Sequence, residues 1–206
     1  LLVSELLWPI SKQLKKYLEE EKIQLEKVII SCFDADTVCH PKYLACLSHA
    51  FLSQESPYRV SYQPIPVYHN NIWHAPSFAR VVEISSSFWQ LVQSMRRDKL
   101  VTFSSHSMAF KTLVEVDYWP VDMISDDSAI FWKAFLHFDG DYHVVPISVT
   151  VSMDVAFDKS LVKTIVNQYK QKRRWAWGVE NFPMLMEGFF KPNKIPLGSK
   201  IERTFQ

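Results

Sequence analysis

The pattern of hydrophobic and polar positions predicts short strands separated by helices. Runs of β-branched and apolar residues predict strands at 28–33, 59–63, 101–104 and 144–151. Helical periodicity predicts helices at 11–26, from Pro41 onward, and at 77–97, 127–138 and 159–173. Strands that alternate with helices are typical of a layered α/β domain, so we expect an α/β fold.

The segments between and at the ends of these elements refine the picture. The first helix is strongly charged, which predicts a helix at the surface. Three prolines and a pair of asparagines between 64 and 76 predict a loop. The last helix carries its apolar side chains on one face, namely Leu161, Val162, Ile165, Val166 and Tyr169.

Composition narrows the class of protein. A chain of 206 residues forms one large domain or a domain with an appendage, and 14% aromatic residues support a sizeable core. A net charge of +1 gives no general bias toward nucleic acid. With four glycines and no glycine-rich motif, the chain offers no glycine-rich phosphate loop.

The three cysteines, Cys32, Cys39 and Cys46, are spaced by seven residues. An odd number without a Cys-x-x-Cys pair argues against a disulfide framework and favours buried, reduced thiols. A metal cluster with His40 and His49 is the less favoured alternative, because the spacing does not suit a tetrahedral site.

Membrane and targeting signals are weak in this chain. No uncharged apolar run approaches the roughly 20 residues that span a bilayer. The chain does not start with Met and has no basic flank of a signal peptide. We therefore expect it to be part of a longer protein.

The first candidate for chemistry is Asp34-Ala35-Asp36, at the end of the predicted strand 28–33. Ligands of open α/β sheets bind at the carboxyl ends of strands. Two carboxylates there can share Mg²⁺ or Mn²⁺, which would hold a diphosphate. A solvated turn is the alternative, because Asp-x-Asp is common.

The second candidate is Ser125-Asp126-Asp127, just before an aromatic-rich helix. A carboxylate near other acids can have a raised pKa and act as a general base. Acidic residues at the start of a helix are equally typical of capping.

The third candidate is the basic and aromatic run 171–178, Gln-Lys-Arg-Arg-Trp-Ala-Trp-Gly. Arginine binds phosphate and tryptophan stacks on sugar rings. A basic helix end is the structural alternative. Binding of a single nucleic-acid strand is disfavoured, because the patch is short and the rest of the chain is neutral.

Taken in order, the three motifs resemble the processive branch of the family 2 glycosyltransferases, which includes cellulose, chitin and hyaluronan synthases. The pattern of that branch is DxD, an acidic pair such as TED or GDD, and QxxRW. Here Asp34 and Asp36 resemble the DxD motif. Asp126 and Asp127 resemble the acidic pair, and Ser125 stands where the family has Thr or Gly. QxxRW, the most specific motif, matches the residues Gln171, Arg174 and Trp175.

This resemblance covers residues 26–180 and implies a GT-A fold with a mostly parallel sheet flanked by helices. Only 33 residues precede Asp34, so we expect the amino-terminal strands of that fold to be missing. The expected organisation is a lead-in at 1–25, a partial catalytic domain at 26–180, and a tail at 181–206 toward a membrane segment. The parent protein would be membrane-associated, with this domain on the cytoplasmic side.

The resemblance also implies roles for individual residues. Asp127 would be the catalytic base, and Asp36 would face Mg²⁺ or Mn²⁺. Residues expected at the donor and acceptor are Asp34, Asp126, Gln171, Arg174 and Trp175, with His106 and Ser107 on an acceptor-side loop. The implied reaction is inverting transfer from a nucleotide sugar, most typically a UDP-sugar, to a glycan or lipid-linked hydroxyl, with no nucleic-acid partner.

Two other functions stay open at this point. A degenerate transferase domain would bind a nucleotide or a glycan without catalysis. A glycoside hydrolase would use paired carboxylates and need neither nucleotide nor metal, but it does not explain QxxRW.

Overall fold

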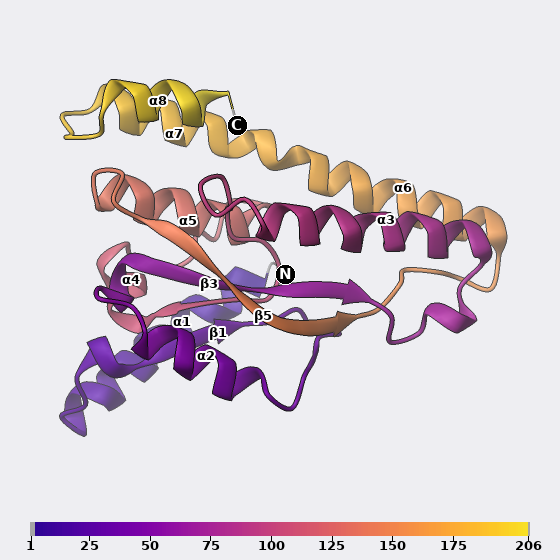
Figure 1. The fold of residues 1–206 in the computed structure, drawn as a ribbon, viewed down its shortest axis with the longest axis horizontal. Helices are drawn as coiled ribbons and strands as arrows, with labels where there is room; N and C mark the ends of the chain where they lie inside the picture. Colours follow the sequence, from indigo (N-terminus) through magenta and orange to yellow (C-terminus); the bar gives the residue numbers. More distant parts are fainter. Residues whose placement is uncertain (1–2, 206) are drawn as a thin grey trace.

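The computed structural model describes residues 3–205, which form a curled five-stranded sheet between layers of helices (Figure 1). The strands are β1 (Ile29–Cys32), β2 (Val38–Cys39), β3 (Val60–Tyr68), β4 (His106–Ala109) and β5 (His143–Met153). Their spatial order is β1-β4-β3-β5-β2. The predicted α/β class is confirmed.

The sheet is mixed, and the prediction of a mostly parallel sheet is wrong. Only β3 and β5 pair in parallel, whereas β4 is antiparallel to both β1 and β3, and β2 is antiparallel to β5. The alternation of strands and helices in the sequence gives the length of each connection. It does not show at which edge of the sheet the next strand begins, and this decides whether that strand is parallel or antiparallel to its neighbour. The chain re-enters with the start of β4 beside the end of β1, where His106 pairs with Cys32.

Strand β3 is longer than predicted and contains Pro64 and Pro66. The register shifts between Gln63 and Ile65, and beyond Tyr62 the strand pairs with β5 but not with β4. Proline lacks the N–H of a ladder hydrogen bond, so it suits a bulge or a strand with one free side. The predicted loop therefore begins only after Tyr68.

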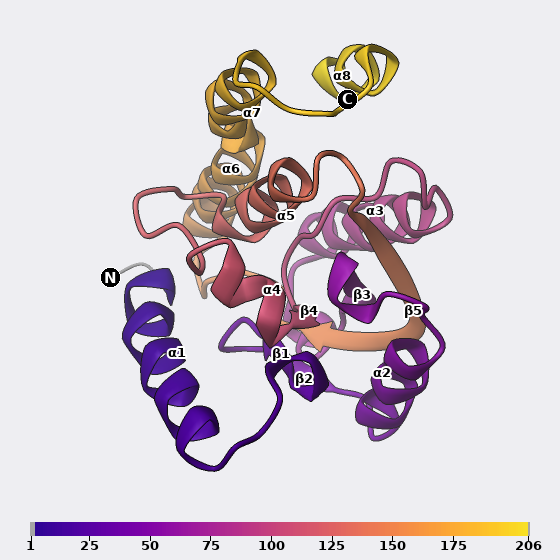
Figure 2. The same cartoon turned by 90° about the vertical axis from the view of Figure 1, so that its left-hand side faces the viewer.

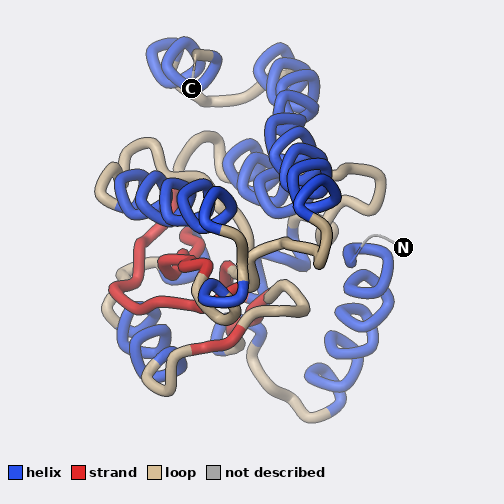
Figure 3. The backbone as a smooth tube through the Cα atoms, turned by 90° about the vertical axis from the view of Figure 1, so that its right-hand side faces the viewer, coloured by secondary structure: helices blue, strands red, loops and turns tan. Residues whose placement is uncertain are grey.

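The helices lie in layers on the two faces of the sheet. They are α1 (Val3–Glu20), α2 (Tyr43–Leu52), α3 (Ser77–Ser94), α4 (Phe110–Glu115), α5 (Asp126–His137), α6 (Leu161–Ala176), α7 (Asn181–Phe190) and α8 (Leu197–Thr204). Helix α2 lies on one side of the sheet, and α3 and α5 on the other, with α6, α7 and α8 outside them, whereas α1 lies beside α4 (Figures 1 and 2). Figure 3 shows the strands in red, with helices in blue around them. The predicted tail thus contains two helices.

Three apolar clusters hold the sheet to its helices, and the smallest of them lies between α3 and the ends of β3 and β5. On one face Tyr43, Leu47 and Phe51 of α2 pack with strand residues of β3 and β5. On the other, α5 buries Ile130, Phe131 and neighbouring aromatic residues in the larger cluster. Because the body of α5 is buried, its first turn has a fixed position at the sheet.

The apolar face of α6 is exposed. Its two buried residues are the polar Thr164 and Gln168, whereas Leu161, Val162, Ile165, Val166 and Tyr169 face outward. The Gln168 Nε2 donates to the carbonyl of Ala156 at 2.8 Å. Within residues 3–205, no helix combines the length and hydropathy needed to cross a bilayer.

The segment 101–104, predicted as a strand, is a loop that a buried side chain organises. The Gln63 Nε2 donates to the carbonyl of Ser104 at 3.1 Å, and its Oε1 accepts from the Phe103 N–H at 3.1 Å. The Gln63 side chain is fully buried. These bonds satisfy the backbone that a neighbouring strand would otherwise pair with.

We expect Gln63→Leu to lower the free energy of unfolding by about 2 kcal/mol, because it leaves a buried N–H and a buried carbonyl without partners. Chemical denaturation measures the change. The exposed Gln13→Leu on α1 is the control and should lie within about 0.5 kcal/mol of wild type. Equal effects of the two variants would contradict this account of the loop.

Candidate functional site

One edge of the sheet collects the ends of β1, β3 and β5 and the starts of β2 and β4. The pairs Cys32–His106 and Tyr68–Met153 lie at this edge. The Asp-x-Asp motif follows β1 directly at this edge. There the Asp154 N–H donates to Asp36 Oδ2 at 3.1 Å.

Asp34 and Asp36 are both exposed, in the turn after β1. The Thr37 N–H donates to the Asp34 carbonyl at 3.0 Å, as in an ordinary turn. The Asp34 side chain also accepts a 2.5 Å hydrogen bond from Ser104 Oγ. This bond ties the motif to the loop that Gln63 organises.

The acidic pair occupies the first turn of α5, and its two members differ. Asp126 Oδ1 accepts from the Asp127 N–H at 3.0 Å, which is a local role at the helix start. Asp127 Oδ1 instead lies 3.5 Å from Nδ1 of His106, and the Asp127 side chain is 33% exposed to solvent. Asp127 is therefore the member of the pair that lies against the buried His106 while part of its side chain stays exposed.

Electrostatics link the three motifs. Burial among protein atoms, followed by the charges of Asp126 and Asp34, raises the pKa of Asp127 to about 8, while Arg174 lowers it. Burial and the same three carboxylates raise the pKa of Cys32 at the end of β1. The structure thus brings one member of DxD, both acids of the pair and the arginine of QxxRW within electrostatic reach.

An aromatic contact joins QxxRW to the sheet. The rings of Trp175 and Tyr68 lie 6.0 Å apart, and Lys172 Nζ lies 3.8 Å from the centre of the Trp175 ring. Burial above all raises the pKa of Tyr68, and both carboxylates of DxD contribute. Tyr68 therefore lies between the DxD turn and the end of α6.

The remaining motif residues differ in exposure. Arg174 is exposed. Gln171 is half-buried, and its Oε1 is buried without a hydrogen-bond partner in the described part of the chain. A buried acceptor without a partner is costly, so this oxygen suits a hydroxyl or amide donor of a ligand.

His106 and Ser107 do not reach the surface. Both side chains are fully buried. Ser107 Oγ shares hydrogen bonds with Ser31 Oγ at 2.6 Å and with the Tyr43 hydroxyl at 2.7 Å. Neither side chain offers a surface to an acceptor here, and both belong to the interior behind the acidic motifs.

Two residues that sequence reasoning missed fix the start of α5. The Ser125 N–H and Oγ donate to Glu180 Oε1 at 2.6 and 2.8 Å. Asn181 Nδ2 donates to Ser128 Oγ at 2.7 Å. Glu180 and Asn181 carry no motif of their own, so the only available signal was their position just after QxxRW.

The position of α6 depends on a buried charge pair. Glu83 of α3 has 1% exposure, and its Oε2 accepts from Lys172 Nζ at 2.9 Å. Lys172 also donates to Ser86 Oγ at 2.9 Å. The pair holds the end of α6, and with it Trp175, against α3.

A divalent cation fits this edge only with help from a ligand. No group of three or more His, Cys, Asp or Glu side chains suited to a metal occurs within residues 3–205. Mg²⁺ on phosphates needs only one or two carboxylates, because phosphate oxygens and water complete its shell. The exposed carboxylate of Asp36 meets that requirement. The three cysteines are free thiols.

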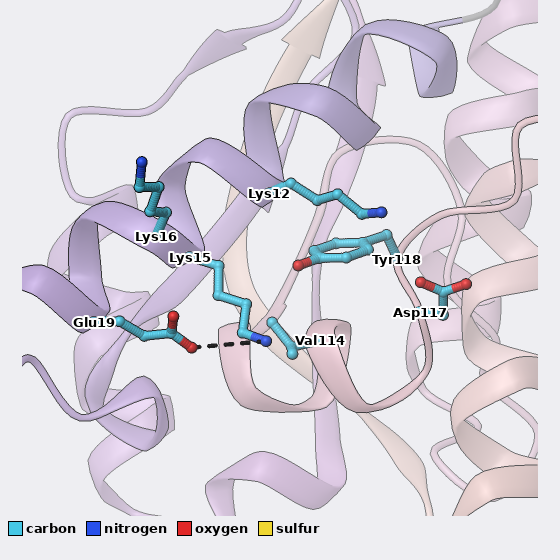
Figure 4. Close-up of a pocket in the computed structure, with 7 residues that line it drawn as sticks. All are labelled: Lys12, Lys15, Lys16, Glu19, Val114, Asp117 and Tyr118. Carbon is cyan, nitrogen blue, oxygen red and sulfur yellow. Dashed lines mark ion pairs between the residues drawn. The ribbon is translucent and has the colours of Figure 1, made fainter.

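A separate hollow of about 380 Å³ lies between α1 and the end of α4. Figure 4 shows Lys15 directed toward Glu19 and Lys12 extending over Tyr118. The lining contains no residue of the three motifs. The hollow is therefore distinct from the acidic edge of the sheet.

The sequence model of glycosyl transferase family group 2 matches residues 29–199 of this chain. The match covers most of the chain and includes all three motifs, so the chain belongs to this family. Membership implies a GT-A fold and sugar transfer from a nucleotide-sugar donor. A search of individually curated proteins gave no match.

The raised pKa of Asp127 predicts an unusual pH dependence of stability. Between its ordinary value of 3.8 and about 8, the folded state holds a proton that the unfolded state has lost. The free energy of unfolding therefore falls as pH rises through this window. Asp127→Asn removes this contribution, so its stability relative to wild type should increase from pH 4 to pH 8 in thermal unfolding.

Asp126→Asn provides the matched comparison, because it removes one of the charges that raise the pKa of Asp127. In the Asp126→Asn protein, the increase in stability that Asp127→Asn brings between pH 4 and pH 8 should therefore be smaller. A gain that is constant across pH would contradict a raised pKa.

Lys172→Met should lower the free energy of unfolding by about 2–3 kcal/mol, because Glu83 is left as a buried charge without its partner. The double variant Glu83→Leu/Lys172→Met should recover most of the loss. Lys16→Met, which breaks an exposed pair with Glu20 on α1, is the control and should cost at most about 0.5 kcal/mol. A loss equal to that of the control would refute the anchoring role.

Proposed function

We propose that this protein catalyses inverting, metal-dependent transfer of a sugar from a nucleotide sugar to a hydroxyl of a glycan or lipid-linked acceptor. The observation that carries the proposal is the position of Asp127. Its carboxylate is partly exposed and lies within electrostatic reach of Asp34 and Arg174. A base, a donor site and a cation for the diphosphate are the three parts that this reaction needs.

Asp127 is the general base of the proposed reaction. It accepts the proton of the acceptor hydroxyl, whose oxygen attacks the anomeric carbon opposite the diphosphate. The bond from that carbon to the diphosphate oxygen breaks, and the nucleoside diphosphate leaves with the electron pair. A base works best when its pKa is close to the working pH, and the pKa of Asp127 is raised to about 8.

The other motif residues bind the donor and the acceptor end. The guanidinium of Arg174 stabilises the negative charge of the leaving diphosphate. Mg²⁺ or Mn²⁺, held by Asp36 and the phosphates, would supply further neutralisation of that charge. Trp175 offers a ring for stacking on a sugar, and the unpartnered Oε1 of Gln171 accepts a hydroxyl hydrogen bond.

Release of nucleoside diphosphate tests the proposal. We would supply the full-length protein, in membranes of the expressing host, with a panel of nucleotide sugars that starts with UDP-sugars, with and without Mn²⁺. Asp127→Asn should reduce the rate by about 10²–10⁴-fold and leave donor binding within a few fold. Asp36→Asn should remove the response to Mn²⁺.

Asp141→Asn is the control, because Asp141 is exposed and pairs with Arg59 just before the start of β5, at the opposite edge of the sheet. It should leave release unchanged. Full activity of Asp127→Asn would exclude this residue as the base. Donor binding without release from any nucleotide sugar would instead identify a non-catalytic binding domain.

A further inference from the structure

The buried imidazole of His106 has a defined proton position. The Trp119 Nε1–H points at His106 Nε2, with the two nitrogens 3.4 Å apart. An indole N–H can only donate, so Nε2 must be the unprotonated nitrogen that accepts. Burial lowers the pKa of His106 to about 4, against the opposing effect of hydrogen bonding to the Phe103 backbone. A neutral ring that accepts at Nε2 carries its proton on Nδ1.

That Nδ1–H faces the carboxylate of Asp127. The distance from His106 Nδ1 to Asp127 Oδ1 is 3.5 Å, slightly longer than a formed N–H···O hydrogen bond. Within the described chain Nδ1 forms no hydrogen bond of good geometry, although the Phe103 backbone also lies near the ring. A buried donor without a partner is costly, and a small rotation of the Asp127 carboxylate would satisfy it. Catalytic hydrogen bonds that are long without substrate often shorten when substrate binds.

The surrounding contacts fix both partners of this pair. Thr102 Oγ1 donates to the backbone carbonyl of Asp127 at 2.6 Å, which ties the start of α5 to the loop before β4. His106 is held by its pairing with Cys32 at the start of β4. The side chain of Asp127 is thus the movable part, and His106 is the fixed one.

We propose that His106 is a positioning residue for Asp127, with Trp119 holding the imidazole in the Nδ1–H form so that it binds Oδ1 and leaves Oδ2 for the acceptor hydroxyl. This assignment rests on the proposed role of Asp127 as the base. His106 itself stays buried and touches neither donor nor acceptor. It acts from the interior of the protein on the carboxylate of Asp127, which is in contact with the interior and partly exposed.

The contact also tunes the ionisation of Asp127. A hydrogen bond to the ionised carboxylate favours that form and opposes the effect of burial and of the neighbouring Asp126 and Asp34 charges. Arg174 acts in the same direction as His106 from α6, and the Cys32 thiol is a further titratable group beside the carboxylates. Loss of the donor should therefore raise the pKa of Asp127.

The test compares two substitutions at one position in the full-length protein. His106→Leu removes the donor, whereas His106→Asn places an amide N–H near the original Nδ1. For His106→Leu we expect kcat to fall about 10-fold, the donor KM to stay within twofold, and the ascending limb of the pH–rate profile to move up by about one pH unit. His106→Asn should recover most of the rate and the wild-type limb.

Trp119→Phe keeps His106 in place and removes only the N–H that fixes the tautomer, so it guards against a folding defect of the Leu variant. In ¹⁵N NMR spectra of histidine-labelled protein, wild-type His106 should be protonated at Nδ1, and Trp119→Phe should populate the Nε2–H form. A wild-type ring protonated at Nε2, or an unshifted pH limb in folded His106→Leu, would overturn the assignment.

Failure of the proposed function gives a different result. If wild type transfers no sugar at any pH, the pKa of Asp127 can still be followed by ¹³C NMR of its carboxyl carbon. A higher pKa in His106→Leu than in wild type and His106→Asn would support the His106–Asp127 contact while refuting the transferase. Equal pKa values in all three proteins would refute the contact itself.

Discussion

The side chain of Gln63 holds the loop from which the rest of the site is built. Its amide bonds to the backbone of Phe103 and Ser104, and the same loop then reaches both acidic motifs. Ser104 donates to Asp34, and Thr102 donates to the backbone of Asp127. The two motifs lie about 90 residues apart in sequence, so a loop without such an anchor would leave their relative positions undefined. The buried side chain of Gln63, with its amide groups hydrogen-bonded, thus provides the backbone of this loop with the partners that a neighbouring strand would otherwise provide.

The site combines acidic side chains at the sheet edge with the opposing positive charge of Arg174 on α6. Burial, together with the nearby charges of Asp126 and Asp34, raises the pKa of Asp127 at the sheet edge. Arg174 opposes this effect, and its helix is tied to α3 through the buried Glu83–Lys172 pair. Residues just beyond QxxRW return to α5, where Glu180 binds the Ser125 N–H and hydroxyl. The QxxRW region therefore supplies both a charge for the site and the bonds that hold the acidic pair in place.

Family membership and local geometry explain different parts of this protein. Membership in glycosyl transferase family group 2 implies a nucleotide-sugar donor. The geometry distinguishes Asp126, which bonds to the helix start, from Asp127, which faces the site. It also separates His106 and Ser107 from the exposed motif residues, because both are buried behind them. In the proposed mechanism, a buried residue that is distant from the motifs in sequence therefore serves the site without touching its ligands.

The sequence by itself determined the α/β class, the starts of α2, α3, α5 and α6 to within two residues, and the three motifs, because periodicity and short motifs are local properties of the chain. It placed the first helix too far along the chain, at 11–26, and did not predict α4, α7 and α8. It did not determine strand direction, the length of β3 through Pro64 and Pro66, or the loop at 101–104. Each of those depends on which neighbour satisfies a backbone group, and the neighbours are tens of residues away. The contacts of Gln63, Glu180 and His106 are equally long-range. Only the tertiary structure decided them, because a hydrogen bond between distant residues leaves no periodic trace in the sequence.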